Sequence, residues 1–167
     1  MEKLCKYGDL PFKAALIHGG PGAAGEMTPV GRELSKYISL LEPLQTEITI
    51  EGQLGELKST LEKHADLPVT LIGYSWGAWL SFIFASHYPE YVSKLILVSS
   101  GPFEQKYADK IMEIRFSRMD ERERLQFDSI FNDLDKPNIQ ERNTSFAKLG
   151  KLISKTDTYD SIEYPDE

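Results

Sequence analysis

The feature that most constrains this 167-residue chain is a glycine–serine turn between a strand-like run and a helix-like run. The turn, residues 73–77, has the sequence Gly-Tyr-Ser-Trp-Gly. β-Branched and aliphatic residues at 68–72 precede it, and an apolar helical segment at 79–88 follows it. A strand, a sharp turn and a helix in this order predict that Ser75 has a strained backbone and an exposed hydroxyl. Glycine is required on both sides because a Cβ would be crowded there.

A second glycine-rich loop can act on the same point. Residues 13–17 predict another buried strand, which leads into His-Gly-Gly-Pro-Gly at 18–22. This run is too rich in glycine to begin a helix, and it offers unhindered backbone N–H groups. The helix after Ser75 also directs free N–H groups and its positive dipole end at the serine. Two loops that direct amides at one point can stabilise the oxyanion of a tetrahedral intermediate.

Together these motifs resemble the α/β-hydrolase superfamily, and within it the proline iminopeptidase-like branch, in which an HGGPG loop accompanies a G-x-S-W-G elbow. The resemblance covers residues 12–102. It implies that Ser75 is a nucleophile that attacks an ester or amide carbonyl. It also implies that the backbone N–H of Trp76 and that of Gly19 or Gly20 form the oxyanion hole. The substrate would be a small molecule or a peptide with a free N-terminal residue.

Strands that alternate with helices predict an α/β fold with parallel pairing. The resemblance implies a partial α/β-hydrolase fold with a central, mostly parallel sheet of about four strands, flanked by helices. In sheet order these strands are 38–41, 13–17, 68–72 and 94–98. Thr28 and Pro29 predict the N-cap and first residue of one flanking helix. Four strands with two open edges would leave unpaired backbone N–H and C=O groups on a lone monomer, and these groups can pair with another chain.

Beyond Pro102 the pattern becomes helical. Asp120 and Glu123 have the spacing of a capping box that begins a helix carrying Phe127 to Leu134. The resemblance divides the chain into a partial hydrolase core, a helical cap and an acidic tail. Their bounds are residues 1–102, 103–158 and 159–167.

A serine needs a base, usually a histidine held by a carboxylate. The family order is Ser, acid, His, with both partners after the cap, but this sequence has no histidine after His87. The resemblance assigns His18 to ordering the HGGPG loop, and His64 is predicted near the end of a surface helix. His87 would lie on the order of 18 Å from the serine, at the far end of its helix. We therefore expect a truncated or split hydrolase, without the catalytic Asp and His.

Composition excludes several functions. Lys and Arg number 19 against 26 Asp and Glu, a net charge of −7, and no basic cluster indicates a nucleic-acid partner. No apolar run is long enough to span a membrane, and residues 1–10 lack a signal-peptide core, so we expect a cytoplasmic protein. Cys5 is the single cysteine, which rules out an internal disulfide. No metal-ligand or dinucleotide spacing is present, so we expect neither metal nor cofactor.

Three functions remain open. The first is a serine hydrolase, or a fragment of one, that forms a Ser75 acyl-enzyme. The second is a non-catalytic binding or interaction protein that keeps the hydrolase scaffold. The third is a subunit whose histidine comes from a complementing chain or a second copy, joined through the open sheet edges.

Overall fold

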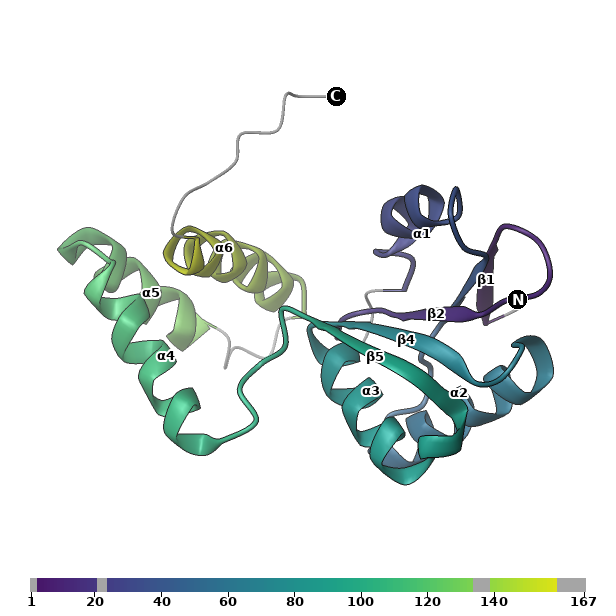
Figure 1. The fold of residues 1–167 in the computed structure, drawn as a ribbon. Helices are drawn as coiled ribbons and strands as arrows, with labels where there is room; N and C mark the ends of the chain where they lie inside the picture. The colour runs from purple at the N-terminus through teal and green to yellow at the C-terminus, as the bar shows by residue number, and fades with distance from the viewer. Residues whose placement is uncertain (1–2, 21–23, 134–138, 159–167) are drawn as a thin grey trace. The chain divides into compact units, whose positions relative to one another are not determined.

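The computed structural model describes residues 3–20, 24–133 and 139–158. The chain divides into two compact units, residues 1–101 and 102–167, which Figure 1 shows as an α/β unit and a helical unit. In the described residues, no helix is long and apolar enough to cross a membrane.

The first unit is built on a five-stranded sheet with the order β1-β3-β2-β4-β5. The strands are β1 (Leu4–Tyr7), β2 (Ala14–Ile17), β3 (Leu40–Pro43), β4 (Val69–Tyr74) and β5 (Val92–Val98). β1 is antiparallel to β3, whereas the β2–β3, β2–β4 and β4–β5 pairs are parallel. The predicted order of the four parallel strands is confirmed, and the sheet has one strand more than predicted.

The additional strand makes β1, rather than β3, one of the two edges of the sheet, and β5 is the other. β1 pairs with the outer side of β3, with Leu4 opposite Pro43 and Tyr7 opposite Leu40. The short run of residues 4–7 has no clear alternation, so its pairing depends on β3 being available beside it. Among the described residues, β5 is the edge strand with exposed apolar side chains: Ile96 is 39% exposed, Leu97 37% and Val98 41%.

Helices cover both faces of the sheet. α1 (Thr28–Leu34) lies on one face, and α2 (Ile50–His64) and α3 (Trp76–His87) lie on the other, as Figure 1 shows. Side chains of β2 alternate between the two layers because successive residues in a strand point to opposite faces. Ala15 and Ile17 pack in the α2–α3 core, whereas Ala14 and Leu16 pack in the α1 core.

Several predicted bounds differ from the observed ones by one to three residues. The strand expected at 38–41 is Leu40–Pro43, so it does not stop before its proline. A proline is tolerated at the end of a strand because it lacks only the N–H of the ladder. The N-cap of α1 is Met27 rather than Thr28. The Thr28 hydroxyl instead lies 3.1 Å from the hydroxyl of Tyr7.

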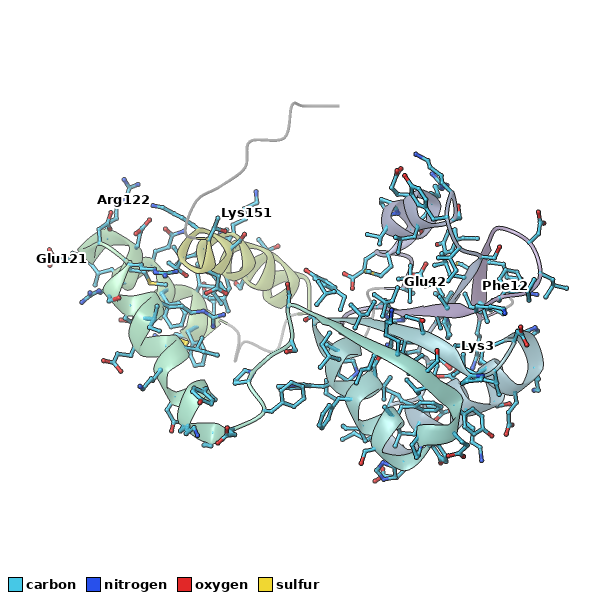
Figure 2. All side chains as sticks on the ribbon, in the orientation of Figure 1. Lys3, Phe12, Glu42, Glu121, Arg122 and Lys151 are labelled. Carbon is cyan, nitrogen blue, oxygen red and sulfur yellow. The ribbon has the colours of Figure 1, made fainter. Side chains whose placement is uncertain are left out.

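The second unit contains three helices within its described residues: α4 (Gln105–Ser117), α5 (Glu121–Asp133) and α6 (Ile139–Asp157). They pack around a small apolar core of Met119, Phe127 and Leu152. Charged side chains project outward from α5 and α6; Figure 2 labels Glu121, Arg122 and Lys151.

The predicted capping box at the start of α5 is confirmed. The Glu123 N–H donates to Asp120 Oδ1 at 2.8 Å, and the Asp120 N–H donates to Glu123 Oε2 at 3.0 Å. Glu123 also pairs with Lys155 of α6, which ties the two helices together. Leu134, expected in α5, and the acidic tail at 159–167 lie outside the described residues.

Candidate active site

Ser75 stands between the end of β4 and the first residue of α3. Its backbone has φ 52° and ψ −117°, a region that residues with a Cβ rarely adopt. Such a conformation costs about 1–3 kcal/mol and persists only where the surroundings hold it. Here the Ser75 N–H donates to Val98 O at 3.0 Å, and Ser75 O accepts from the Ala78 N–H at 3.1 Å. Among the described residues, no group hydrogen-bonds to the half-buried Ser75 hydroxyl.

The two glycines of the turn are required by close backbone contacts. A Cβ on Gly73 would lie 2.3 Å from Gly77 O. A Cβ on Gly77 would lie 2.1 Å from Ile17 O and 2.5 Å from His18 O. The first turn of α3 therefore packs directly against the end of β2, which brings the loop after β2 to the serine.

The loop that begins at His18 lies beside Ser75. A Cβ built on Gly19 would be 3.6 Å from Ser75 Cβ, whereas one on Gly20 would meet open space. The Trp76 N–H belongs to the first turn of α3, where the helix offers it no acceptor. Pro21 and Gly22, the last residues of the predicted motif, lie outside the described residues.

The Gly19 N–H, one of the amides predicted for an oxyanion hole, has a partner in this structure. It donates to Oε1 of Glu26 at 2.5 Å. Nothing in the sequence singles out Glu26, because no motif spacing connects it to the serine.

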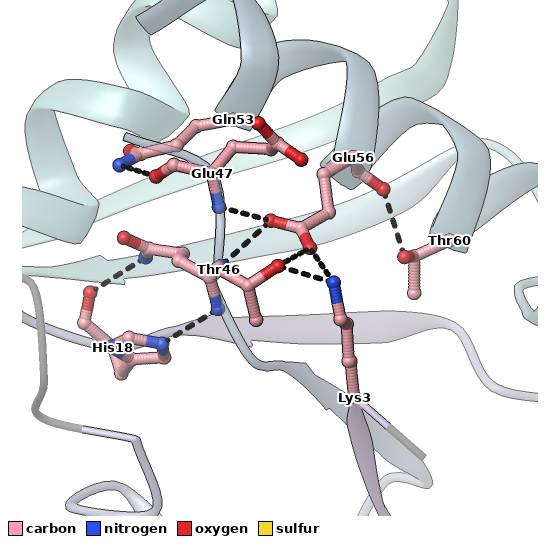
Figure 3. Close-up of polar contacts among 8 residues, drawn as sticks. Lys3, His18, Thr46, Glu47, Gln53, Glu56 and Thr60 are labelled. Atoms are coloured by element: carbon pink, nitrogen blue, oxygen red, sulfur yellow. Dashed lines mark hydrogen bonds and ion pairs between the residues drawn. The ribbon is translucent and has the colours of Figure 1, made fainter. Parts of the chain in front are cut away.

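His18 is fully buried, and both of its ring nitrogens are engaged; Figure 3 shows the contact of Nε2 with the chain after β3. Nε2 accepts from the Gln45 N–H at 3.0 Å, so the proton is on Nδ1, which donates to Gly19 O at 2.9 Å. The Gln45 side chain also donates to His18 O at 3.1 Å. These contacts fasten the start of the glycine-rich loop to the chain after β3 and leave neither ring nitrogen free to take the serine proton.

The other two histidines are at helix C-termini. His64 is in the last turn of α2. His87 is exposed in the last turn of α3, the opposite end from Ser75, with Nδ1 2.9 Å from Ile83 O. Among the described residues of the first unit, no histidine is therefore placed to act as a base for the serine.

Two tryptophans fix the elbow helix from the side. Trp76 Nε1 donates to Gln53 Oε1 at 3.0 Å, and the buried Gln53 side chain donates to Glu47 O at 2.9 Å. Trp76 and Trp79 meet edge to face, with ring centroids 5.9 Å apart.

Gln53 and Gln45 were missed by sequence reasoning, because an isolated glutamine on a helix or in a loop carries no pattern.

A carboxylate network holds the loop that carries Gln45 (Figure 3). Glu56 accepts from the Thr46 N–H at 2.9 Å, the Thr46 hydroxyl at 2.5 Å and the Glu47 N–H at 3.3 Å. Lys3 lies 3.6 Å from the same carboxylate. Burial acts to raise the pKa of Glu56, but the hydrogen bonds from Thr46 and Glu47, with Lys3, bring that pKa below its ordinary value.

A fully buried carboxylate lies under α1. Glu42, labelled in Figure 2, is fully buried and accepts from the Tyr7 hydroxyl at 2.6 Å through Oε2. Its other oxygen has no hydrogen-bond partner among the described residues. Burial and this bond to Glu42 raise the pKa of Tyr7 to about 12.

Comparison with known proteins identifies the fold. Residues 54–129 match the family described as "alpha/beta hydrolase fold". The crystal structure of VinJ superposes on 98% of this chain and 68% of its own, with a TM-score of 0.70 and 17% identity. The chain has part of the α/β-hydrolase fold.

Other structures with the α/β-hydrolase fold match more weakly. The thioesterase domain from the curacin biosynthetic pathway has a TM-score of 0.53 and 22% identity over 69% of this chain and 46% of its own. The Bacillus megaterium epoxide hydrolase has a TM-score of 0.57 and 19% identity over 91% and 55%. This chain thus spans about half to two-thirds of the α/β-hydrolase chains that it matches. No curated protein matches the sequence.

Proposed function

We propose that this chain carries the nucleophile and oxyanion-binding portion of a serine hydrolase. Ser75 Oγ attacks the carbonyl carbon of an ester or amide while a base takes the hydroxyl proton. The tetrahedral intermediate collapses to a Ser75 acyl-enzyme, and the leaving alcohol or amine departs with that proton. Water then hydrolyses the acyl-enzyme and regenerates the serine.

The observation that carries this proposal is the approach of Gly19 to Ser75. The position of a Gly19 Cβ is 3.6 Å from Ser75 Cβ, while Ser75 has a backbone conformation with φ 52°. A strained serine on a strand–helix turn, beside a loop of glycine amides, is the arrangement that acyl transfer requires. The Trp76 N–H and the N–H of Gly19 or Gly20 would bind the oxyanion. His18 would order the loop that carries the two glycines.

The catalytic acid and base would come from outside residues 1–167, either from a longer form of this chain or from a second chain. For the base this follows from the three histidines, since His18 is engaged at both ring nitrogens and the other two lie at helix C-termini. For the acid it follows from the family resemblance, in which the acid comes after the cap. Without the base we expect turnover to be reduced by several orders of magnitude. Oxyanion binding alone would leave a small residual activity.

The substrate proposed is an ester or amide, and specifically a peptide with a free N-terminal residue. This narrower choice depends on the HGGPG and G-x-S-W-G motifs together, which are similar to those of the proline iminopeptidase-like branch. Aminoacyl naphthylamides, N-acetylated equivalents and short p-nitrophenyl esters would separate an aminopeptidase from a general esterase. Faster cleavage of the free-amine substrates would support the narrower choice.

Covalent labelling of Ser75 by a fluorophosphonate tests the proposed function. We expect labelling of the purified chain at high probe concentration, with the adduct on the peptide that contains Ser75. Ser75→Ala should abolish it, whereas Ser86→Ala, a change at an exposed serine of the same helix, should leave it unchanged. Absence of labelling together with absence of ester hydrolysis would contradict catalysis by this chain.

A partner at β5 is a related proposal, supported by the exposed apolar residues of that edge. Ile96, Leu97 and Val98 are each more than a third exposed. A complementing chain or a second copy that paired with this strand would cover them. We expect the molar mass from light scattering to rise with concentration, and any esterase activity to rise with it. Esterase activity per mole that is independent of concentration in a strictly monomeric sample would contradict this proposal.

A non-catalytic binding protein is the second candidate, favoured by the absence of a histidine beside Ser75 among the described residues. It predicts that an ester or amide ligand raises the melting temperature without turnover. It also predicts that adding a chain with the missing acid and histidine restores no activity. Turnover abolished by Ser75→Ala would exclude this candidate.

A further inference from the structure

The carboxylate of Glu26 lies at the amide that the proposed mechanism uses. Glu26 Oε1 accepts from the Gly19 N–H at 2.5 Å. A Cβ on Gly19 would be 2.4 Å from this oxygen and 3.6 Å from Ser75 Cβ, which places the oxygen no more than 6.0 Å from Ser75 Cβ. The carboxylate and the serine therefore converge on one small region beside Gly19.

We propose that Glu26 occupies the oxyanion-binding amide of Gly19 in the resting protein, so that a substrate carbonyl must displace it. This inference depends on the proposed function, because it uses the same amide and the same serine. A carboxylate oxygen is negatively charged, as is the oxygen of a tetrahedral intermediate. It can therefore make the same charge-assisted hydrogen bond to a backbone N–H. Glu26 is in this sense an internal competitor of the substrate.

The surroundings of Glu26 favour displacement. The residue is exposed, so water can solvate the carboxylate once it leaves the amide. Among the described residues, Glu26 has no cationic partner that would hold it in place. Glu33 of α1, by contrast, is paired with Lys36 at 2.6 Å. The Gly19 N–H is thus the contact that a substrate has to break.

The charge of Glu26 also selects among substrates. After displacement the carboxylate stays within a side chain's length of the serine, where it repels an acyl group that carries negative charge next to its carbonyl. An uncharged acyl group avoids this repulsion, and a cationic one is attracted. The interaction is weakened by solvent at such an exposed position, so we expect the preference to be a few-fold.

Labelling rates of Glu26 variants test the competition. We expect Glu26→Ala to raise the fluorophosphonate labelling rate of Ser75 by about tenfold, because an ionic hydrogen bond no longer competes for the amide. Glu26→Gln, which keeps a neutral acceptor, should lie between the wild type and the alanine variant. Glu33→Ala removes one exposed carboxylate from the neighbouring helix and should leave the rate unchanged.

The same variants test the charge preference. In the wild type, a fluorophosphonate with a cationic substituent should label faster than an otherwise matched probe with an anionic substituent. Both Glu26 variants should reduce this ratio, and Glu33→Ala should not. A labelling rate that falls in Glu26→Ala would overturn the proposal, since Glu26 would then assist the serine. An unchanged rate would overturn it as well.

A readout without chemistry separates this inference from the proposed function. In ¹⁵N–¹H spectra we expect the Gly19 amide proton to be shifted downfield by the charged acceptor. It should move upfield in Glu26→Ala and stay in place in Glu33→Ala. If Ser75 is labelled in no variant and no ester is hydrolysed, the proposed function fails, and the Gly19 resonance alone decides whether Glu26 occupies the amide. A resonance that Glu26→Ala does not move would overturn the inference.

Discussion

Gly77 lies directly against the carbonyl of Ile17, so closely that a Cβ on Gly77 would be 2.1 Å from the Ile17 oxygen. This contact joins the two loops of the candidate site: it sets the start of α3 against the end of β2, from which the glycine-rich loop departs. The glycine of the elbow is therefore required by tertiary packing as well as by the shape of its own turn.

Gly77→Ala should be strongly destabilising. The new methyl group would meet only backbone atoms of Ile17 and His18, so no side-chain rotation can make room for it. We expect a loss of more than about 3 kcal/mol in the free energy of unfolding. The matched control is Gly55→Ala in α2, where a Cβ meets open space. That change should stabilise the protein by about 0.5–1 kcal/mol. Urea denaturation of both variants measures the two effects, and equal effects would contradict the packing argument.

Ser75→Gly should stabilise the protein while removing the nucleophile. Glycine adopts φ 52° and ψ −117° without a Cβ clash, whereas serine is strained there. After allowance for the greater freedom of glycine in the unfolded chain, we expect a gain of about 1 kcal/mol. Ser86→Gly, in the last turns of α3, should instead lose about 0.5–1 kcal/mol. A melting temperature that falls in Ser75→Gly would show that this backbone is not strained.

The bond between Trp76 and Gln53 should be measurable by a double-mutant cycle. Gln53→Leu leaves the indole N–H without its acceptor, and Trp76→Phe leaves the glutamine oxygen without its donor. Each single change should cost about 1–3 kcal/mol, and the pair should cost less than their sum by about 1 kcal/mol. Unfolding of the four proteins in denaturant gives the coupling energy, and additive losses would contradict a direct bond.

Glu56 should make stability depend on pH in the acid range. Its pKa is lowered from the ordinary value of 4.5 in the folded protein, so the unfolded state binds a proton more readily. The contribution of Glu56 is therefore fully present above pH 4.5 and is lost as the pH falls through the lowered folded value. Glu56→Gln should reduce stability near neutral pH and flatten the acid limb of the stability profile. The exposed Glu51→Gln on the same helix should leave that limb unchanged, and equal slopes for Glu56→Gln and wild type would refute the assignment.

The order of the parallel strands followed from the sequence because each strand is a short apolar run that ends at a turn signal. The strained turn at Ser75 was also predictable, because a strand precedes it and a glycine lies on either side of it. β1 escaped prediction because residues 4–7 are half-buried, and their pairing depends on an edge that only the assembled sheet provides. β3 ends later than predicted, at Pro43 opposite Leu4, because a proline at the end of a strand need not donate a hydrogen bond to the ladder.

The residues around the serine likewise include some that the sequence predicts and some that it does not. Gly19, Gly20 and His18 could be named from a local motif. Glu26, Gln45 and Gln53 could not, because each reaches the site from a different segment of the chain through a single side chain. Their contacts with Gly19, His18 and Trp76 are decided by how α1, the loop after β3 and α2 pack on the sheet.

The sequence alone determined the local features, since backbone freedom, apolar periodicity and turn chemistry act over a few neighbouring residues. It placed a serine on a sharp turn between a strand and a helix, and a glycine-rich loop after another strand. Only the tertiary structure decided that a carboxylate meets the Gly19 amide and that both nitrogens of His18 are engaged. Such contacts join residues that are far apart along the chain, and their geometry exists only once the sheet has assembled.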